Sequence, residues 1–234
     1  MTKILNLFSS NQLKIIALVA MTIDHIGFLL LPQYPILRII GRLSFPIFAY
    51  MIAEGCRYTK NRTKYLLVLS ALGVAFQVVY FVADHSLFQG VFVSFSLGIG
   101  LVYAIDNAVK RKNAWSVLLA VAVLIFIGFV CLVLPQILSH TDYKIDYGIF
   151  GVLLPSFVFF WPNKIGKLIG VAAATVGICL LVGGIQWWSL LAIVLLAMYS
   201  GERGKYKLKN LFYIYYPSHL VAIYLIDMLL EMQY

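Results

Sequence analysis

The chain has 234 residues, of which 62% are hydrophobic and 12% are charged, with a mean hydropathy of +0.94. Soluble domains are about 25% charged, so the composition excludes a water-soluble globular protein and predicts an integral membrane protein. Three isolated cysteines without a C-x-x-C spacing indicate buried apolar side chains rather than a disulfide or a metal site.

Hydropathy and helix-breaking residues predict an all-α, polytopic membrane helix bundle with about nine transmembrane helices. We expect one integral membrane domain over residues 1–234, with its core at 13–230. In chain order the expected helices are 13–31, 36–56, 65–83, 90–108, 114–134, 147–162, 166–184, 187–199 and 211–230. The least sharply marked boundary separates the seventh helix from the eighth, at Gly183–Gln186.

Most basic residues fall in the loops after the second, fourth, sixth and eighth expected helices. They are Arg57, Lys60, Arg62, Lys64, Lys110, Arg111, Lys112, Lys164, Lys167, Arg203, Lys205, Lys207 and Lys209. Because positively charged loops stay in the cytoplasm, the N-terminus is predicted to be cytoplasmic and the C-terminus to lie outside. The net charge of +9 therefore indicates membrane topology, and no nucleic-acid partner is expected.

The first expected helix carries Asp24 and His25 side by side in an otherwise apolar stretch. An ionisable group at bilayer depth costs about 2.5–3.5 kcal/mol, so such groups are functional candidates. Lys14 shares a helical face with His25, roughly 16 Å away along the axis. His25 could act as a general base at neutral pH. The alternative is a histidine that only forms a hydrogen bond to a neighbouring helix.

The second expected helix carries Arg38 and Arg42 one turn apart on one face. Arg42 lies deeper and needs a carboxylate or an anionic ligand, and a structural ion pair with Asp24 is the main alternative to a functional role. Arg38 is either a substrate contact or an interfacial cation. Gly41 permits close helix approach, and Pro46 is expected to kink the span, as in broken helices that line cavities.

Beyond Pro46, the inner end of the second helix and the loop after it combine Glu54, Arg57, Tyr58, Asn61 and Arg62. This run is expected either to serve only as positive-inside charge or to hold a phosphate-rich ligand at the cytoplasmic face as well.

Two further groups of polar residues lie in the second half of the chain. Asp146 and Tyr147 precede the sixth helix, where an N-cap is the ordinary explanation. The ninth helix places Tyr216, Pro217 and His219 near the middle of the membrane, where the proline frees backbone acceptors beside the histidine. His219 is expected either to take part in chemistry or to bridge helices.

Several chemistries lack their motifs. The sequence contains no H-E-x-x-H, no G-x-S-x-G, no P-loop and no dinucleotide fingerprint. Among four histidines, only two fall deep in expected helices, so no metal centre is expected.

Four blocks of the sequence resemble the TraX family, which is named after the F-pilin acetylase. The blocks are Leu13–Ala17 with Ile23–Gly27, Gly41–Ala49 with Ala53–Gly55 and Tyr58–Arg62, Asp146–Leu153, and Tyr216–Leu220. They occur in order over nearly the whole chain, and the first two are the specific ones. One block differs, because Gly90–Gly98 stands where the family pattern has an Asn-led segment.

The resemblance implies a multispanning acetyltransferase in a bacterial plasma membrane, related to transmembrane acyltransferases. Such proteins take acetyl from cytoplasmic acetyl-CoA and transfer it to an amine or hydroxyl, and the namesake modifies a pilin in conjugation. Together with the residue analysis, it gives three sets of expected site residues. The catalytic set is His25, Asp24, Arg42, His219 and Tyr216; the cofactor-binding set is Lys14, Glu54, Arg57, Tyr58, Asn61 and Arg62; the substrate-binding set is Arg38, Asp146 and Tyr147.

In this mechanism His25 is a general base or an acetyl carrier. Asp24 pairs with Arg42 or orients His25, while His219 and Tyr216 donate hydrogen bonds to the thioester oxygen. The expected partners are the lipid bilayer and an acceptor protein or glycan of the cell envelope, with a homo-oligomer left open. The alternatives are a proton-coupled transporter or lipid flippase and a non-catalytic scaffold for envelope assembly.

Overall fold

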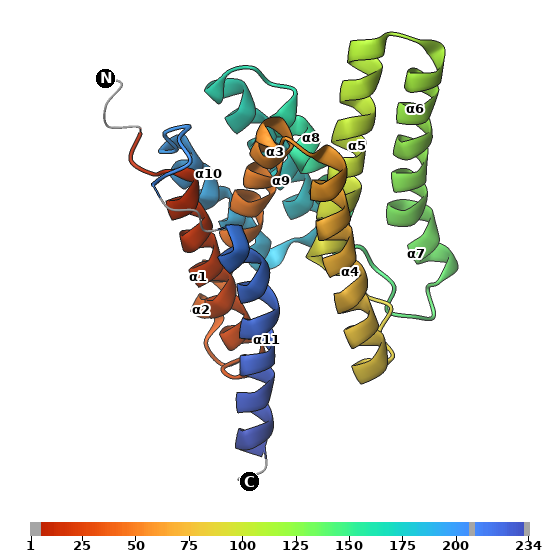
Figure 1. Ribbon diagram of the computed structural model, residues 1–234. Helices are drawn as coiled ribbons and strands as arrows, with labels where there is room; N and C mark the ends of the chain where they lie inside the picture. The colour runs from red at the N-terminus through yellow and green to blue at the C-terminus, as the bar shows by residue number, and fades with distance from the viewer. Residues whose placement is uncertain (1–5, 206–208, 232–234) are drawn as a thin grey trace. The chain divides into compact units, whose positions relative to one another are not determined.

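A computed structural model describes residues 6–205 and 209–231, except for the side chains at 209–213, 217 and 231. Within these ranges all regular elements are helical, which confirms the all-α prediction (Figure 1). The elements are α1 (Ser10–Leu29), α2 (Pro35–Gly41), α3 (Ser44–Tyr58), α4 (Arg62–Asp84), α5 (Val91–Arg111), α6 (Ala114–Gly128), the π-helix η1 (Phe129–Val133), α7 (Leu134–Ile137), α8 (Gly148–Phe159), α9 (Lys164–Val182), the 3-10 helix η2 (Gly184–Leu191), α10 (Ala192–Ala197) and α11 (Lys209–Glu231).

Six helical segments of the described chain are long and apolar enough to cross a membrane. They are Ser10–Leu29, Pro35–Tyr58, Arg62–Asp84, Val91–Arg111, Ala114–Ile137 and Lys164–Val182. Three shorter apolar helices, Gly148–Phe159, Gly184–Ala197 and Ile214–Leu230, lie where the sixth, eighth and ninth helices were expected. A multispanning membrane protein is therefore confirmed, whereas nine complete crossings and a cytoplasmic N-terminus stay predictions.

The chain separates into two compact units. The first unit combines Met1–Phe48 with Gly183–Tyr234, so it joins the two ends of the sequence. The second unit is the continuous segment Ala49–Val182. The expectation of one domain over the whole chain stays a prediction.

In the first unit, the start of α1 is fixed by its own cap and by the loop that follows α10. The Ser9 side chain accepts a hydrogen bond from the backbone N–H of Gln12, and the Gln12 side chain accepts one from the Ser9 N–H, which completes a capping box. The next two backbone amides, of Ser10 and Asn11, donate to the carbonyls of Glu202 and Arg203. These bonds satisfy donors that a helix start leaves open.

The second expected helix is broken before Pro46, not at it. The α2 helix ends at Gly41 and α3 begins at Ser44, so Pro46 occupies the first turn of α3. Backbone N–H groups in the first turn of a helix have no partner within that helix, so a proline, which lacks this N–H, loses no hydrogen bond there. Its fixed φ also suits a helix start. The break lies next to Arg42 and sets α2 apart as a short helix.

In the second unit, side-chain bonds join three connections at one end of the helices. Arg62 at the start of α4 pairs with Asp106 near the end of α5, with 2.6 Å between Nη1 and Oδ2. Glu54 of α3 pairs with Lys167 of α9, also at 2.6 Å. Three of the loops predicted to share the cytoplasmic side therefore lie at the same end of this unit.

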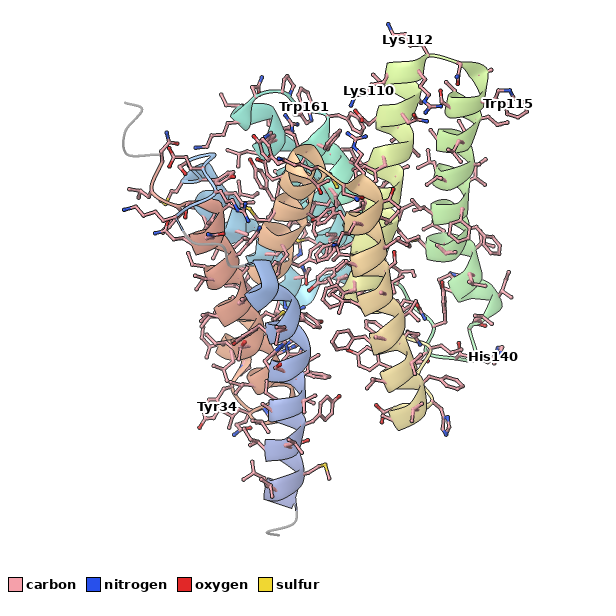
Figure 2. The ribbon with its side chains drawn as sticks, viewed as in Figure 1. Tyr34, Lys110, Lys112, Trp115, His140 and Trp161 are labelled. Carbon is pink, nitrogen blue, oxygen red and sulfur yellow. The ribbon has the colours of Figure 1, made fainter. Side chains whose placement is uncertain are left out.

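At the opposite end of the second unit, hydrogen bonds join the segment after α4 to the segment before α8. The Asp142 carboxylate accepts hydrogen bonds from the hydroxyl of Ser86 and the backbone N–H of Leu87. Figure 2 shows the α5–α6 turn, with Lys110, Lys112 and Trp115, at the end away from His140. Basic residues and an exposed tryptophan thus mark one end, as expected for a membrane interface.

Candidate functional site

Asp24 lies at the centre of a cluster with two arginines in the first unit. Its Oδ2 accepts from Arg38 Nη1 at 2.6 Å, and both of its oxygens accept from Arg42 Nη2, at 2.6 and 2.8 Å. The side chains of Asp24 and Arg42 are only 14% and 13% exposed, whereas that of Arg38 is 26% exposed. The structure thus contains both the predicted Asp24–Arg42 pair and a second cation.

The close packing of α2 on α1 depends on Gly41. A Cβ atom at this position would lie 2.0 Å from Oδ1 of Asp24, inside the carboxylate itself. Arg42 follows directly and donates from Nε to the Arg38 carbonyl and from Nη1 to Gln186 Oε1, both at 3.3 Å. The missing side chain therefore lets the short helix bring its arginines onto the carboxylate.

His25 contacts His219 of α11, which the sequence did not predict. Nδ1 of His25 lies 3.3 Å from Nε2 of His219, and the rings meet edge to face with centroids 5.1 Å apart. Each Nδ1 also bonds the carbonyl four residues earlier, of Met21 at 2.9 Å and of Tyr215 at 3.1 Å. Two histidines from the two ends of the chain thus form one pair.

The two carbonyls determine which ring nitrogens carry protons. A carbonyl oxygen only accepts hydrogen bonds, so neutral His25 and neutral His219 both carry their proton on Nδ1. Nε2 of His219 then has a lone pair and accepts from Nδ1–H of His25, whose proton is shared with the Met21 carbonyl. Nε2 of His25 also has a lone pair and has no hydrogen-bond partner among the described residues. Chemically, this atom is a base.

Two neighbouring tyrosines flank His219 in different ways. The Tyr215 ring stacks on the imidazole, with an angle of 12° between the planes, and the Tyr216 ring meets it edge-on. The Thr22 hydroxyl donates to the Leu18 carbonyl, so it accepts its 2.9 Å bond from the Tyr215 hydroxyl. The sequence singled out Tyr216, but Tyr215 is the tyrosine that links α11 to α1.

Several residues expected to bind a cofactor are engaged within the second unit. Glu54 pairs with Lys167, and Arg62 pairs with Asp106. Arg57 donates to the carbonyls of Phe159 and Trp161 at the end of α8. Asn61 caps α4 by accepting from the Lys64 backbone N–H. Tyr58, which also belongs to the expected cofactor-binding set, is 68% exposed at the end of α3.

The remaining expected residues lie in different parts of the fold. Lys14 is half-buried near the start of α1. Asp146 and Tyr147 belong to the second unit, where the Asp146 carbonyl accepts from the Ser94 hydroxyl at 2.7 Å. Tyr147 has a φ of 59°, a left-handed conformation that is costly for a residue with a Cβ atom. Lys207, one of the predicted topology markers, lies outside the described residues.

No group of three or more His, Cys, Asp or Glu side chains that could hold a metal occurs in the described part of the chain. The expectation that no metal is needed stays a prediction. The site contains instead one ion-paired carboxylate and two imidazole rings in contact.

Comparison with known proteins decides the family. Residues 9–227 match the family model described as TraX protein. The chain belongs to the TraX family. The resemblance found in the four sequence blocks is thereby confirmed, and the TraX match includes both arginines and both histidines of the site.

Two relatives of this TraX chain differ in how much of it they cover. It is 27% identical to the "Probable fimbrial assembly protein FimC, serogroup H1" of Dichelobacter nodosus, over 96% of this chain and 98% of the relative. It is 31% identical to an uncharacterized protein of Rickettsia prowazekii (strain Madrid E), over 42% of this chain and 38% of that protein. No solved structure matches it.

Sequence reasoning missed Gln186 and Tyr215 in this TraX site. Gln186 is 2% exposed in η2, and its amide oxygen accepts from Arg42. A polar residue inside an apolar segment was the available signal for Gln186, but it was interpreted only as part of a helix boundary. Tyr216 belongs to the resembling block Tyr216–Leu220, whereas nothing in the sequence indicated that Tyr215 contacts α1.

Proposed function

We propose that this TraX-family protein is an acetyltransferase of the bacterial plasma membrane. It moves an acetyl group from cytoplasmic acetyl-CoA to an amine or hydroxyl acceptor on the other side of the membrane. The observation that supports this best is the His25–His219 pair, which leaves a lone pair on Nε2 of His25 without a partner among the described residues. A neutral imidazole in that state can take a proton from an attacking amine or hydroxyl.

The Asp24 cluster has a positioning role in this proposal. Both carboxylate oxygens already accept from guanidinium groups, so Asp24 is not the base that activates the acceptor. It anchors α2 against α1 one residue before His25 and so fixes where the imidazole lies. Of the two roles considered for Asp24, pairing with arginine fits these contacts.

The donor has to place its thioester near His25 while its phosphates stay near water. Lys14 lies on the same face of α1, about 16 Å from His25 along the axis, which suits an extended pantetheine arm. Among the expected cofactor-binding residues, Lys14 belongs to the same unit as His25, so it is the proposed contact to the donor's phosphates.

The acceptor is proposed to belong to a pilus, a fimbria or another envelope structure. The support is the TraX membership and the relative named as a probable fimbrial assembly protein. An N-terminal amine of a pilin-like subunit has the required chemistry, because it can lose a proton to His25 as it attacks the thioester.

The test is the transfer of label from radiolabelled acetyl-CoA into membrane fractions that contain the protein. His25→Gln is expected to lower incorporation about 100- to 10,000-fold, the usual contribution of a general base. His140→Gln, which changes an exposed histidine of the second unit, is the matched control and should leave it unchanged. Full activity of His25→Gln would exclude this base.

A transporter is the second candidate, because an ion-paired carboxylate and a histidine pair inside a membrane helix bundle also suit a proton path. Purified protein separates the two. Absence of acetyl-CoA binding together with proton-coupled uptake into vesicles would favour transport over acetyl transfer.

A further inference from the structure

The α1 and α11 helices pack side by side in the same chain direction. Thr22 of α1 bonds Tyr215 of α11, and His25 contacts His219 three to four residues further along both helices. Figure 1 shows the two helices adjacent over this stretch. The histidine contact is therefore one of several contacts along the interface between α1 and α11.

Both imidazole rings are held in one orientation. Each Nδ1 bonds the carbonyl of its own helix, of Met21 or of Tyr215. Turning either ring over would break that bond. The Tyr215 ring, fixed by its hydroxyl on Thr22, covers one face of the His219 imidazole. The lone pair on Nε2 of His219 therefore stays directed at Nδ1 of His25.

His219 is also the basic group in contact with His25. Asp24, its neighbour in the chain, has both oxygens occupied by Arg38 and Arg42. The Met21 carbonyl accepts a hydrogen bond but does not become protonated under ordinary conditions. Among the described residues, no other group that can accept a proton bonds the His25 ring.

We propose that His25 and His219 form a two-histidine proton relay, in which His219 takes up the proton that leaves Nδ1 of His25. The role of the relay in catalysis rests on the proposed acetyl transfer. This assignment replaces the expectation that His219 donates to the thioester oxygen, because neutral His219 has no proton on Nε2.

Bonds and protons are conserved over one acetyl transfer through the relay. The acceptor nitrogen or oxygen bonds to the acetyl carbonyl carbon, the carbon–sulfur bond breaks, and its electron pair leaves on the CoA sulfur. The acceptor's proton moves to Nε2 of His25, and the Nδ1 proton of His25 moves to Nε2 of His219. The Nε2 proton of His25 then passes to the CoA thiolate, and His219 returns its proton to Nδ1 of His25.

The first test observes the pair directly, by ¹⁵N magnetic resonance of histidine-labelled full-length protein in lipid. His85→Asn and His140→Gln remove the two other histidines, and asparagine tolerates the left-handed backbone at position 85, where φ is 52°. We expect both neutral rings to carry the proton on Nδ1. As the first proton is taken up, Nδ1 of His25 and Nε2 of His219 should shift together.

A neutral His25 with its proton on Nε2 would overturn the relay. Protonation of His25 without any change at His219 would overturn it as well. Because this readout needs no acetyl-CoA, it is independent of the proposed function. Shared protonation in a protein that transfers no acetyl would keep the relay and reject the acetyltransferase.

The second test separates a relay from simple positioning. In His219→Gln, the amide oxygen can still accept from Nδ1 of His25 but cannot carry a proton. We expect acetyl transfer to fall about 10- to 100-fold, part of the usual effect of proton-transfer groups. His140→Gln, which changes an exposed histidine of the second unit, is the control and should leave the rate unchanged. Wild-type activity of His219→Gln would reduce His219 to a positioning residue.

Discussion

At the scale of single residues, Asp24 is expected to stabilise the fold through its two arginine partners. It is the shared partner of Arg38 and Arg42 and is itself 14% exposed. In Asp24→Asn two guanidinium groups lose their counterion, so we expect the free energy of unfolding to fall by about 3 kcal/mol. Thermal unfolding of the purified protein in detergent measures this loss.

The control for that prediction is Asp227→Asn. Asp227 lies on α11 and takes part in no ion pair among the residues that the structure describes. Its substitution should leave the unfolding temperature nearly unchanged. Equal effects of the two substitutions would contradict a special role for Asp24.

The residue scale also shows where the sequence was informative. An acid in an apolar helix needs a cation, and Arg42 was the deep candidate, so the Asp24–Arg42 pair could be predicted. Arg38 lies on the same helical face as Arg42. Whether Arg38 also reaches the Asp24 carboxylate depends on how closely α2 approaches α1. Tyr215 and Tyr216 differ by about 100° around α11, and the rotation of α11 against α1 is a tertiary property.

At the scale of elements, the contact between α1 and α2 depends on Gly41. We expect Gly41→Ala to separate the helices, because its Cβ atom would lie 2.0 Å from Asp24 Oδ1. Acetyl transfer and unfolding temperature should both fall. Gly100→Ala in α5 is the matched control, since a Cβ atom there meets nothing within 4 Å. Equal effects of Gly41→Ala and Gly100→Ala on acetyl transfer and unfolding temperature would contradict the close approach of α2 to α1.

The connections at the far end of the second unit predict a pH dependence. Hydrogen bonds from the Ser86 hydroxyl and the Leu87 N–H hold the pKa of Asp142 below its ordinary value. Because the pKa in the folded state is lower than in the unfolded state, ionised Asp142 stabilises the fold at neutral pH. This contribution is lost as the pH falls through the folded-state pKa.

Ser86→Ala should therefore flatten the dependence of unfolding temperature on pH below about pH 5, where Asp142 takes up its proton. Asp84→Asn is the comparison, since Asp84 accepts no hydrogen bond in the described part of the structure. An unchanged pH profile in Ser86→Ala would show that this bond does not stabilise the fold.

The helices themselves were largely predictable, because apolar length decides a membrane span. Their interruptions were less so. The break before Pro46 lies at Arg42–Leu43, where α2 ends and α3 has not begun. The sequence also could not pair Glu54 with Lys167, because the two lie 113 positions apart and no periodicity connects them.

At the scale of the whole molecule, the two units divide the expected site residues. The ion-paired carboxylate and both histidines belong to the unit built from the chain ends, whereas Glu54, Arg57, Arg62, Asp146 and Tyr147 belong to the other unit. Hydropathy treats all spans alike, so this division could not be predicted. Asp24 and the two histidines thus share one unit, while Glu54 and Arg62 form ion pairs within the other.

Membrane orientation can be tested with single cysteines at the two ends of the second unit. In a background without Cys56, Cys131 and Cys179, Lys112→Cys and His140→Cys introduce exposed thiols. With a cytoplasmic N-terminus, an impermeant maleimide added to intact cells should label position 140 and should reach position 112 only after permeabilisation. The reverse pattern would invert the predicted orientation.

The most direct test of the account is acetyl transfer by purified protein in sealed proteoliposomes that display the Lys112 side to labelled acetyl-CoA. A peptide with a free N-terminal amine is enclosed within the vesicles as the acceptor. We predict that the wild-type protein and His140→Gln label the enclosed peptide equally. With His25→Gln, the label on the peptide should fall at least about 100-fold. Equal labelling by wild type and His25→Gln, or no labelling by a wild-type protein that binds acetyl-CoA, would contradict the central claim.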